Sequence, residues 1–236
     1  MAGGNLSLPA AMSCGRFFLN RRGDLTMSAI PARRLESWEE VPMATPSGKR
    51  LLTIEEFHRM HEAGILLEDD RVELIRGEIY EMSPIGSWHA ACLSRLLHLF
   101  ASLYPRAILS PQNPLALSQQ ESELYPDLIV LRYREDHYES GIPGPESVFL
   151  VIEVSDTTFA SDRDVKVPLY AASGIPEAWI ANQKGDSVIV YRNPTPAGYQ
   201  EVREYRRGET VSPQAFPDLS LPVEEILGRR GKSGPT

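Results

Sequence analysis

Two acidic residues stand where the sequence otherwise predicts buried strands. Glu153 interrupts the apolar run "SVFLVIEVSD" at residues 147–156, and Asp127 opens a second run in "YPDLIVL". Short β-branched runs bounded by turn formers are typical of strands that are buried on both faces. An ionised carboxylate buried without a partner is costly, so it normally pairs or takes up a proton. Glu153 therefore needs a partner, and the identity of that partner bears on function.

A shared divalent cation is one candidate for this partner. If the two strands are neighbours, the carboxylates of Asp127 and Glu153 meet at one edge of the sheet. Close carboxylates repel each other and raise the pKa of one of them, whereas a cation between them removes that penalty. Mg²⁺ prefers oxygen ligands, and it can activate a water and neutralise charge on a phosphate. The pair of acids thus favours phosphate chemistry.

Two more residues could complete such a site. Glu73 lies in the apolar stretch "RVELI", and Lys166 follows the Glu153 strand in the next predicted helix. A lysine there could hold the attacking water or the phosphate charge. Structural alternatives exist for all four residues. Glu153 could pair with an arginine or lysine, Asp127 could cap a turn, and Glu73 and Lys166 could simply face solvent.

The surrounding sequence predicts the elements that would position these side chains. Thr53 and Glu56 form a capping-box pattern at the start of a helix that should end near Gly64. The remaining expected elements are a hairpin around 76–77, a helix at 87–104, strands at 107–118, 127–132 and 147–155, a helix from 161 to 174, hairpins around 184–186 and 207–208, and a helical turn at 221–227. Ser161 and Asp164 would cap the 161–174 helix, and Pro168 should kink it. This order predicts an α/β or α+β fold, a mixed sheet flanked by helices.

Composition narrows the class of protein. The chain has 236 residues, a formal net charge of −8 and two cysteines, Cys14 and Cys92. Two cysteines make no disulfide framework, which predicts a cytoplasmic protein. No apolar stretch approaches the roughly 18 residues of a membrane span, and the acidic balance argues against a large basic nucleic-acid surface. We expect a flexible extension at 1–48, one domain at 49–228 and a loose tail at 229–236.

The ordered set of motifs resembles the Uma-type family of restriction-endonuclease-like proteins, a branch of the PD-(D/E)XK nuclease superfamily. The resemblance extends from about residue 50 to 227. Its motifs are an acid in "ELIRGE", a histidine opening the next helix, "PD", "EVS", a displaced lysine, and "Y…G…W". They match Glu73, His89, Pro126-Asp127, Glu153-Val154-Ser155, Lys166, Tyr170, Gly174 and Trp179.

The resemblance implies a restriction-endonuclease-like mixed sheet and a phosphodiester hydrolase that depends on Mg²⁺ or Mn²⁺. By carry-over, Glu73, Asp127 and Glu153 would bind the metal together with the backbone carbonyl of Val154, and Lys166 would position or activate water. The chain departs from the superfamily at Ser155, where the usual lysine would stand two residues after the second acid. The site would then depend on Lys166 reaching back from the following helix.

The leading hypothesis is therefore a metal-dependent endonuclease acting on DNA. A homodimer is compatible with this hypothesis because duplex cleavage needs two sites. The alternative is a catalytically degenerate nuclease-fold domain that binds nucleic acid or a protein partner. Structural roles are expected for His89, as a hydrogen-bonding residue at a helix start, and for Tyr170 and Trp179 in the core. Other acids are expected to be solvated loop charges or caps: Glu121, Glu123, Glu135, Asp136, Asp156, Asp162 and Asp164.

Overall fold

The structure is a computed structural model that describes residues 17–19, 25–27, 48–67 and 69–229. The chain divides into two units, Met1–Lys49 and Arg50–Thr236. In the first unit, β1 (Phe17–Leu19) pairs with β2 (Leu25–Met27) in an antiparallel arrangement. Most of the expected extension, and the tail from 230, lie outside the described residues, so both remain predictions.

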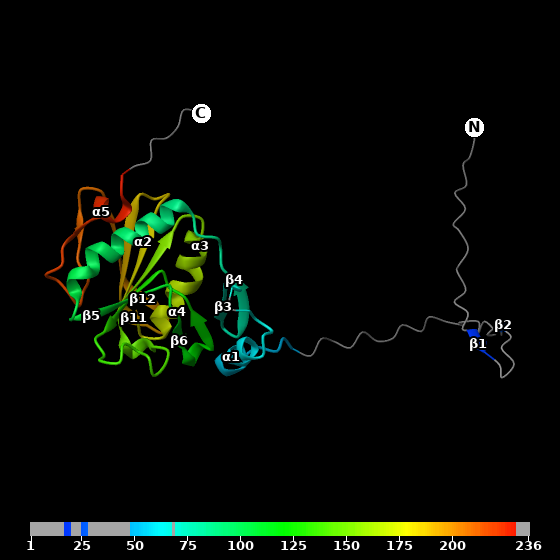
Figure 1. Cartoon of the computed structure of the whole chain (residues 1–236). Coiled ribbons are helices and arrows are strands. Elements are labelled where there is room, and N and C mark those ends of the chain that lie inside the picture. The colour runs from blue at the N-terminus through cyan, green and yellow to red at the C-terminus, as the bar shows by residue number, and fades with distance from the viewer. Residues whose placement is uncertain (1–16, 20–24, 28–47, 68, 230–236) are drawn as a thin grey trace, which may run out of the picture. The chain divides into compact units, whose positions relative to one another are not determined.

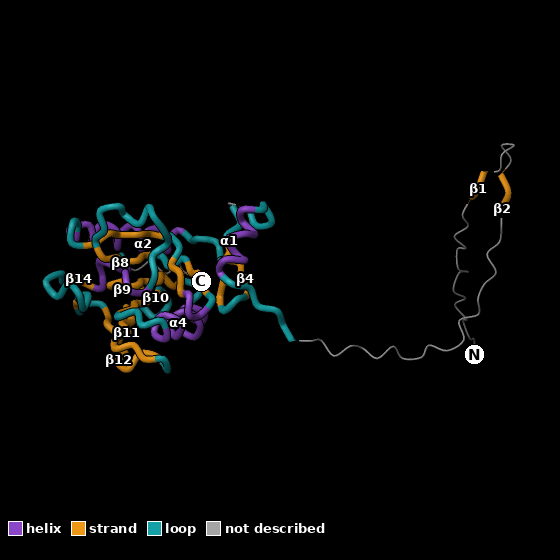
Figure 2. Tube along the Cα trace, turned by 90° about the horizontal axis from the view of Figure 1, so that it is seen from below, coloured by secondary structure: helices purple, strands orange, loops and turns teal. Residues whose placement is uncertain are grey.

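A six-stranded mixed sheet forms the centre of the second unit. Its strand order is β12-β11-β10-β9-β8-β5, and Figure 2 shows β8 to β12 following one another across the sheet. Only the β9–β10 pair is parallel among the pairs described in this sheet. The strands are β5 (Ala107–Pro111), β8 (Leu128–Arg132), β9 (Val148–Ser155), β10 (Glu177–Asn182), β11 (Ser187–Thr195) and β12 (Gly198–Arg206).

A second, antiparallel sheet has the strand order β4-β3-β7-β6. Its strands are β3 (Val72–Ile75), β4 (Glu78–Glu81), β6 (Leu115–Leu117) and β7 (Ser122–Leu124). The β3–β4 hairpin turns at Arg76 and Gly77, both at positive φ, which confirms the predicted hairpin. A small pair of β13 (Thr210–Val211) and β14 (Leu221–Pro222) completes the strands described.

The helices flank these sheets, as the fold class predicts. They are α1 (Ile54–Glu62), α2 (Ser87–Phe100), α3 (Phe159–Ser161), α4 (Val167–Ala172) and α5 (Val223–Leu227), with short 3₁₀ turns at Ala101–Leu103, Ser118–Gln120 and Pro145–Ser147. The capping box at Thr53 and Glu56 is present at the start of α1. Figure 1 shows α2 crossing the strands of the six-stranded sheet.

Two hydrophobic cores pack against opposite faces of this sheet. On one face, Leu96 and Phe100 of α2 pack with Ile152 and Val154 of β9. On the other, Leu169 and Tyr170 of α4 pack with Val151 of β9. Since side chains alternate along a strand, β9 divides its residues from Leu150 onward between two cores, the even ones on the α2 face and the odd ones on the α4 face. Glu153 is odd and therefore lies on the α4 face.

Three local expectations were wrong. The 107–118 strand is interrupted by Gln112, at a φ of 52°, and its two halves enter different sheets. The expected hairpin around 207–208 does not form, because β12 pairs with β11 and β13 pairs with β14. The helix expected from Ser161 begins at Phe159. In each case the local pattern predicts the extended or helical conformation correctly. The pairing of the strands and the ends of the elements depend on residues that are distant in the sequence.

Candidate active site

Asp127 and Glu153 lie opposite each other on the α4 face of the main sheet. The antiparallel register pairs Leu128 with Ile152, so the next positions outward are Asp127 on one strand and Glu153 on the other. Ile129 lies two residues after Asp127, and Val151 lies two residues before Glu153. Both belong to the α4-side core. Alternation therefore places both carboxylates on one face. Both are buried, at 8% and 3% exposure.

Lys166 reaches this face from the helix that follows β9. Its Nζ lies 2.9 Å from Glu73 Oε1 and 3.5 Å from Glu153 Oε1. Glu73 comes from β3 of the second sheet, so the lysine joins acids from both sheets. The structure thus brings Glu73, Glu153 and Lys166 into direct contact, while Asp127 joins them through the shared face and cavity.

A π-helical turn at Asp162–Lys166 sets the direction of Lys166. Within it, the Val167 N–H bonds to the Asp162 carbonyl, five residues back. Pro168 has no N–H, and its ring clashes with the carbonyl four residues earlier in a regular α-helix. The wider turn accommodates Pro168, so the predicted kink takes the form of a π turn. Such turns are frequent at functional sites.

Ser155 lies two residues after Glu153, where the resemblance to PD-(D/E)XK nucleases would place a lysine, and it has a different structural role. It is fully buried, and its hydroxyl donates to Asp162 Oδ2 at 2.5 Å. The Thr158 hydroxyl donates to the same oxygen at 2.7 Å. Asp162 therefore fixes the first turn of the helix to the end of β9. The capping role expected for it was wrong, because its carboxylate accepts from two hydroxyls and not from a backbone N–H at the helix start. Through this anchor, Ser155 helps position the helix that carries Lys166.

Asp127 is held by three groups. His89 Nε2 lies 2.7 Å from Asp127 Oδ1, the Val154 N–H donates to Oδ2 at 2.7 Å, and Gln112 Nε2 donates weakly at 3.5 Å. The hydrogen bond to Asp127 raises the pKa of His89 above its usual value. The structural hydrogen bond expected for His89 is present, and it orients a predicted metal ligand.

The Val154 carbonyl faces the same region. In a strand, the N–H and C=O of one residue point to the same neighbouring strand, and the Val154 N–H already points to Asp127. The backbone geometry therefore directs the predicted carbonyl ligand toward the carboxylate of Asp127.

Two tyrosines that sequence reasoning did not assign to the site also hold its acids. The Tyr125 backbone N–H donates to Glu73 Oε1 at 2.9 Å, and the Tyr170 hydroxyl donates to Glu153 Oε1 at 2.5 Å. Tyr170 is fully buried, as expected of a core residue, yet its polar end contacts the site. Its spacing of four residues from Lys166, one helical turn, was the available signal.

Glu153 and Lys166 have shifted pKa values. Burial raises the pKa of Glu153 well above its usual value, and the neighbouring carboxylates add to this effect against the attraction of Lys166. Burial opposes the charge on Lys166, but the carboxylates of Glu153 and Glu73 outweigh it and raise the lysine pKa. Lys166 is therefore an ammonium ion at neutral pH, while Glu153 retains its proton more readily than an exposed carboxylate.

A cavity of about 540 Å³ gives access to these groups. Its lining includes Glu73, Asp127, Glu153 and Lys166, together with His89. All four predicted site residues therefore face one solvent-accessible hollow. Strongly perturbed acids that line a cavity are typical of functional sites.

The residues fit a divalent metal in kind. Three carboxylates and a backbone carbonyl are the hard oxygen donors that Mg²⁺ and Mn²⁺ prefer. As the side chains stand in the described part of the chain, no three of its His, Cys, Asp and Glu residues are grouped closely enough to enclose an ion. The acid oxygens are instead held by Lys166, His89, Tyr125 and Tyr170. A metal would therefore replace part of this internal pairing.

Comparison with known proteins places the chain in a family. The model of the Uma2 family, described as putative restriction endonuclease, matches residues 54–224. A crystal structure of a putative nuclease belonging to DUF820 from Anabaena variabilis ATCC 29413 has the same fold, with a TM-score of 0.57 and 19% identity. The alignment covers 75% of this chain and 97% of that one. No curated protein matches the sequence. The chain belongs to the Uma2 family of putative restriction endonucleases.

Proposed function

We propose that the protein is a Mg²⁺- or Mn²⁺-dependent endonuclease that hydrolyses phosphodiester bonds in DNA. The observation that carries this proposal is the Lys166 ammonium between Glu73 and Glu153, in a cavity that Asp127 also lines. Family membership and a nuclease-like fold support it.

In this proposal, Glu73, Asp127, Glu153 and the Val154 carbonyl hold the metal. When bound, the metal supplies Lewis acidity, which makes water a better nucleophile and neutralises phosphate charge. Lys166 supplies a fixed positive charge for the phosphate oxygens in the transition state. Its ammonium form, which the neighbouring carboxylates favour, suits this electrostatic role and not that of the base. His89 and Tyr170 hold Asp127 and Glu153 in position.

We further propose a cytoplasmic protein that acts as a homodimer, since each site cuts one strand. No helix in the described part of the chain is long and apolar enough to span a bilayer. Among the described strands, β12 lies at the edge of the six-stranded sheet and offers one surface for self-association. Analytical ultracentrifugation with and without a DNA duplex tests the dimer, and a monomer under both conditions contradicts it.

The alternative is a non-catalytic domain that binds nucleic acid or a protein. The observation in its favour is the internal pairing of the site acids, which leaves no three-residue metal group among the described residues. A protein with this role would keep the fold and bind its partner in EDTA, but it would cut nothing.

The deciding experiment combines calorimetry with plasmid nicking. Purified full-length protein is titrated with Mn²⁺ and then incubated with supercoiled plasmid in Mg²⁺, Mn²⁺ or EDTA. We expect micromolar or tighter Mn²⁺ binding and metal-dependent nicking by the wild type. Glu153→Gln should lose both, whereas Glu135→Gln, which changes an exposed acid, should lose neither. Metal binding without nicking of DNA would support the alternative, and absence of metal binding would overturn the catalytic proposal.

A further inference from the structure

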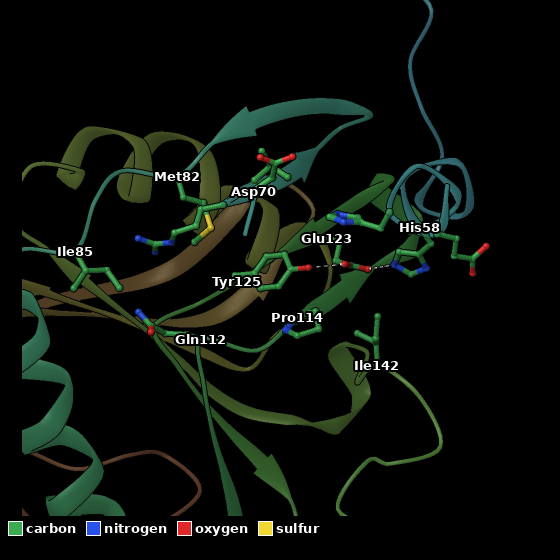
Figure 3. A pocket seen from close by; sticks show the side chains of 13 residues that line it. His58, Asp70, Met82, Ile85, Gln112, Pro114, Glu123, Tyr125 and Ile142 are labelled. Atoms are coloured by element: carbon green, nitrogen blue, oxygen red, sulfur yellow. Dashed lines mark hydrogen bonds and ion pairs between the residues drawn. The ribbon is translucent and has the colours of Figure 1, made fainter. Parts of the chain in front are cut away.

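A second and larger hollow adjoins the candidate active site. It measures about 820 Å³, and Figure 3 shows its lining from α1 on one side to Ile85 and Gln112 on the other. Arg71, Met82, Ile85 and Tyr125 line both this hollow and the catalytic cavity. The two hollows therefore share a wall, and a molecule bound in one lies next to the other. We call the larger one the side pocket.

A buried network holds the side pocket in shape. Glu123, expected to be a solvated loop charge, instead lies in β7 with 1% exposure. Its carboxylate accepts a hydrogen bond from the Tyr125 hydroxyl at 3.2 Å and lies 2.6 Å from His58 Nε2 (Figure 3). The proposed catalytic mechanism uses none of these three side chains. A buried carboxylate with two fixed partners at the wall of a hollow is a preorganised feature.

Tyr125 connects the two hollows. Its backbone N–H holds Glu73 of the catalytic cavity, and its phenol is held by Glu123 in the side pocket. Both ends of the residue are therefore fixed, and its ring forms a rigid aromatic wall. Aromatic rings held in this way are the surfaces on which unstacked nucleobases bind.

The lining distinguishes a base from a phosphate. Apolar groups include two partly exposed isoleucines, Ile85 at 40% and Ile142 at 39%. The acids Glu62, Asp70 and Glu123 would repel a phosphate within the pocket, but their oxygens can accept hydrogen bonds from amino groups on a base. Arg71 lies at the boundary with the catalytic cavity, where a phosphate that connects the two would pass.

From this arrangement we propose that the side pocket binds an unpaired nucleobase next to the phosphate that is cut. The substrate class would then be DNA with an unstacked nucleotide, either single-stranded or extruded from a duplex. This inference rests on the proposed function. It also accounts for a DNA-acting protein with a net charge of −8, because base contacts supply affinity that does not depend on a broad basic surface.

The test compares two fluorescein-labelled duplexes by anisotropy in EDTA and fixed salt. Both carry a one-nucleotide bulge, with adenine in one and an abasic sugar in the other, so that they differ only by the base. We expect the adenine bulge to bind about tenfold more tightly. Ile142→Trp, which fills the pocket from an exposed loop, should remove this difference. Tyr104→Trp, at an exposed position after α2, should retain it.

Equal affinity of wild type for both duplexes would overturn the inference, as would a preference that survives Ile142→Trp in a protein of unchanged melting temperature. If Ile142→Trp lowers the melting temperature, Pro114→Trp is tested in its place. This variant fills the same pocket from another segment and should also remove the difference in affinity. Failure of the proposed function would appear separately, as absence of Mn²⁺-dependent plasmid nicking by the wild type.

Discussion

Lys166 Nζ lies 2.9 Å from Glu73 Oε1, although 93 positions separate the two residues in the chain. Glu73 belongs to β3 of the second sheet, and Lys166 to the π turn that follows β9 of the main sheet. The ion pair therefore joins elements of two sheets, and both residues line one cavity. In the proposed mechanism, Lys166 also supplies the ammonium that the resemblance to PD-(D/E)XK nucleases would place at Ser155.

The role of Lys166 predicts a large loss of cleavage in Lys166→Met. A fixed positive charge near a phosphate transition state contributes about 100-fold or more in rate, and methionine has a similar length without the charge. We expect nicking of supercoiled plasmid in Mn²⁺ to fall by about that factor. Lys184→Met, which removes an exposed turn lysine, serves as the matched control. Equal nicking by Lys166→Met and wild type would show that the lysine only stabilises the fold.

The raised pKa of Glu153 predicts a pH-dependent gain in stability for Glu153→Gln when metal is chelated. A carboxyl with a raised folded-state pKa contributes stability below about pH 4.5, and this contribution is lost as pH rises through the folded pKa. The amide does not titrate but can still accept the Tyr170 hydrogen bond. In EDTA, the unfolding free energy of Glu153→Gln relative to wild type should therefore rise between pH 5 and pH 8. Urea unfolding at both values measures it, and a constant difference contradicts the assigned shift.

The His89–Asp127 hydrogen bond predicts that His89→Ala weakens metal binding without removing a ligand. Partners that orient metal ligands typically contribute about 10- to 100-fold in affinity. Calorimetric titration with Mn²⁺ should show a loss in that range for His89→Ala and a partial recovery for His89→Gln, which can still donate to Asp127. His98→Ala changes a histidine elsewhere on α2 and should bind normally. Unchanged Mn²⁺ affinity in His89→Ala would remove His89 from the site.

For Glu177 we expect a loss of stability without a loss of metal binding, because this buried acid has a structural role. It is fully buried and accepts hydrogen bonds from Trp179 Nε1 at 2.9 Å, Arg192 Nε at 2.8 Å and the Gln214 N–H at 2.6 Å. Removing one partner of a buried ion pair costs about 3–5 kcal/mol. Glu177→Ala should lose about that much unfolding free energy in urea while the folded protein keeps its Mn²⁺ affinity. If folded Glu177→Ala loses its Mn²⁺ affinity, the purely structural role of Glu177 is contradicted.

Much of the architecture could be predicted from the sequence because it depends on local signals. The capping box at Thr53, the turn at Arg76-Gly77 and the apolar period of α2 are properties of neighbouring residues. The anomaly of Glu153 in an apolar run was equally local. It indicated that a polar partner must exist, and the motif order indicated the family. The order of motifs is itself a property of the linear chain.

Only the tertiary structure decided which groups became those partners. Periodicity specifies the face on which a side chain lies, but it does not specify which distant element covers that face. The pairing of Lys166 with Glu73 required the packing of two sheets, and the π turn before Pro168 set its direction. Glu123 shows the same limit. Its sequence neighbours resemble a polar loop, yet pairing of β7 with β3 and β6 buries it. The sequence therefore determined the elements and the acids, while long-range packing decided which cation, histidine and tyrosines meet them.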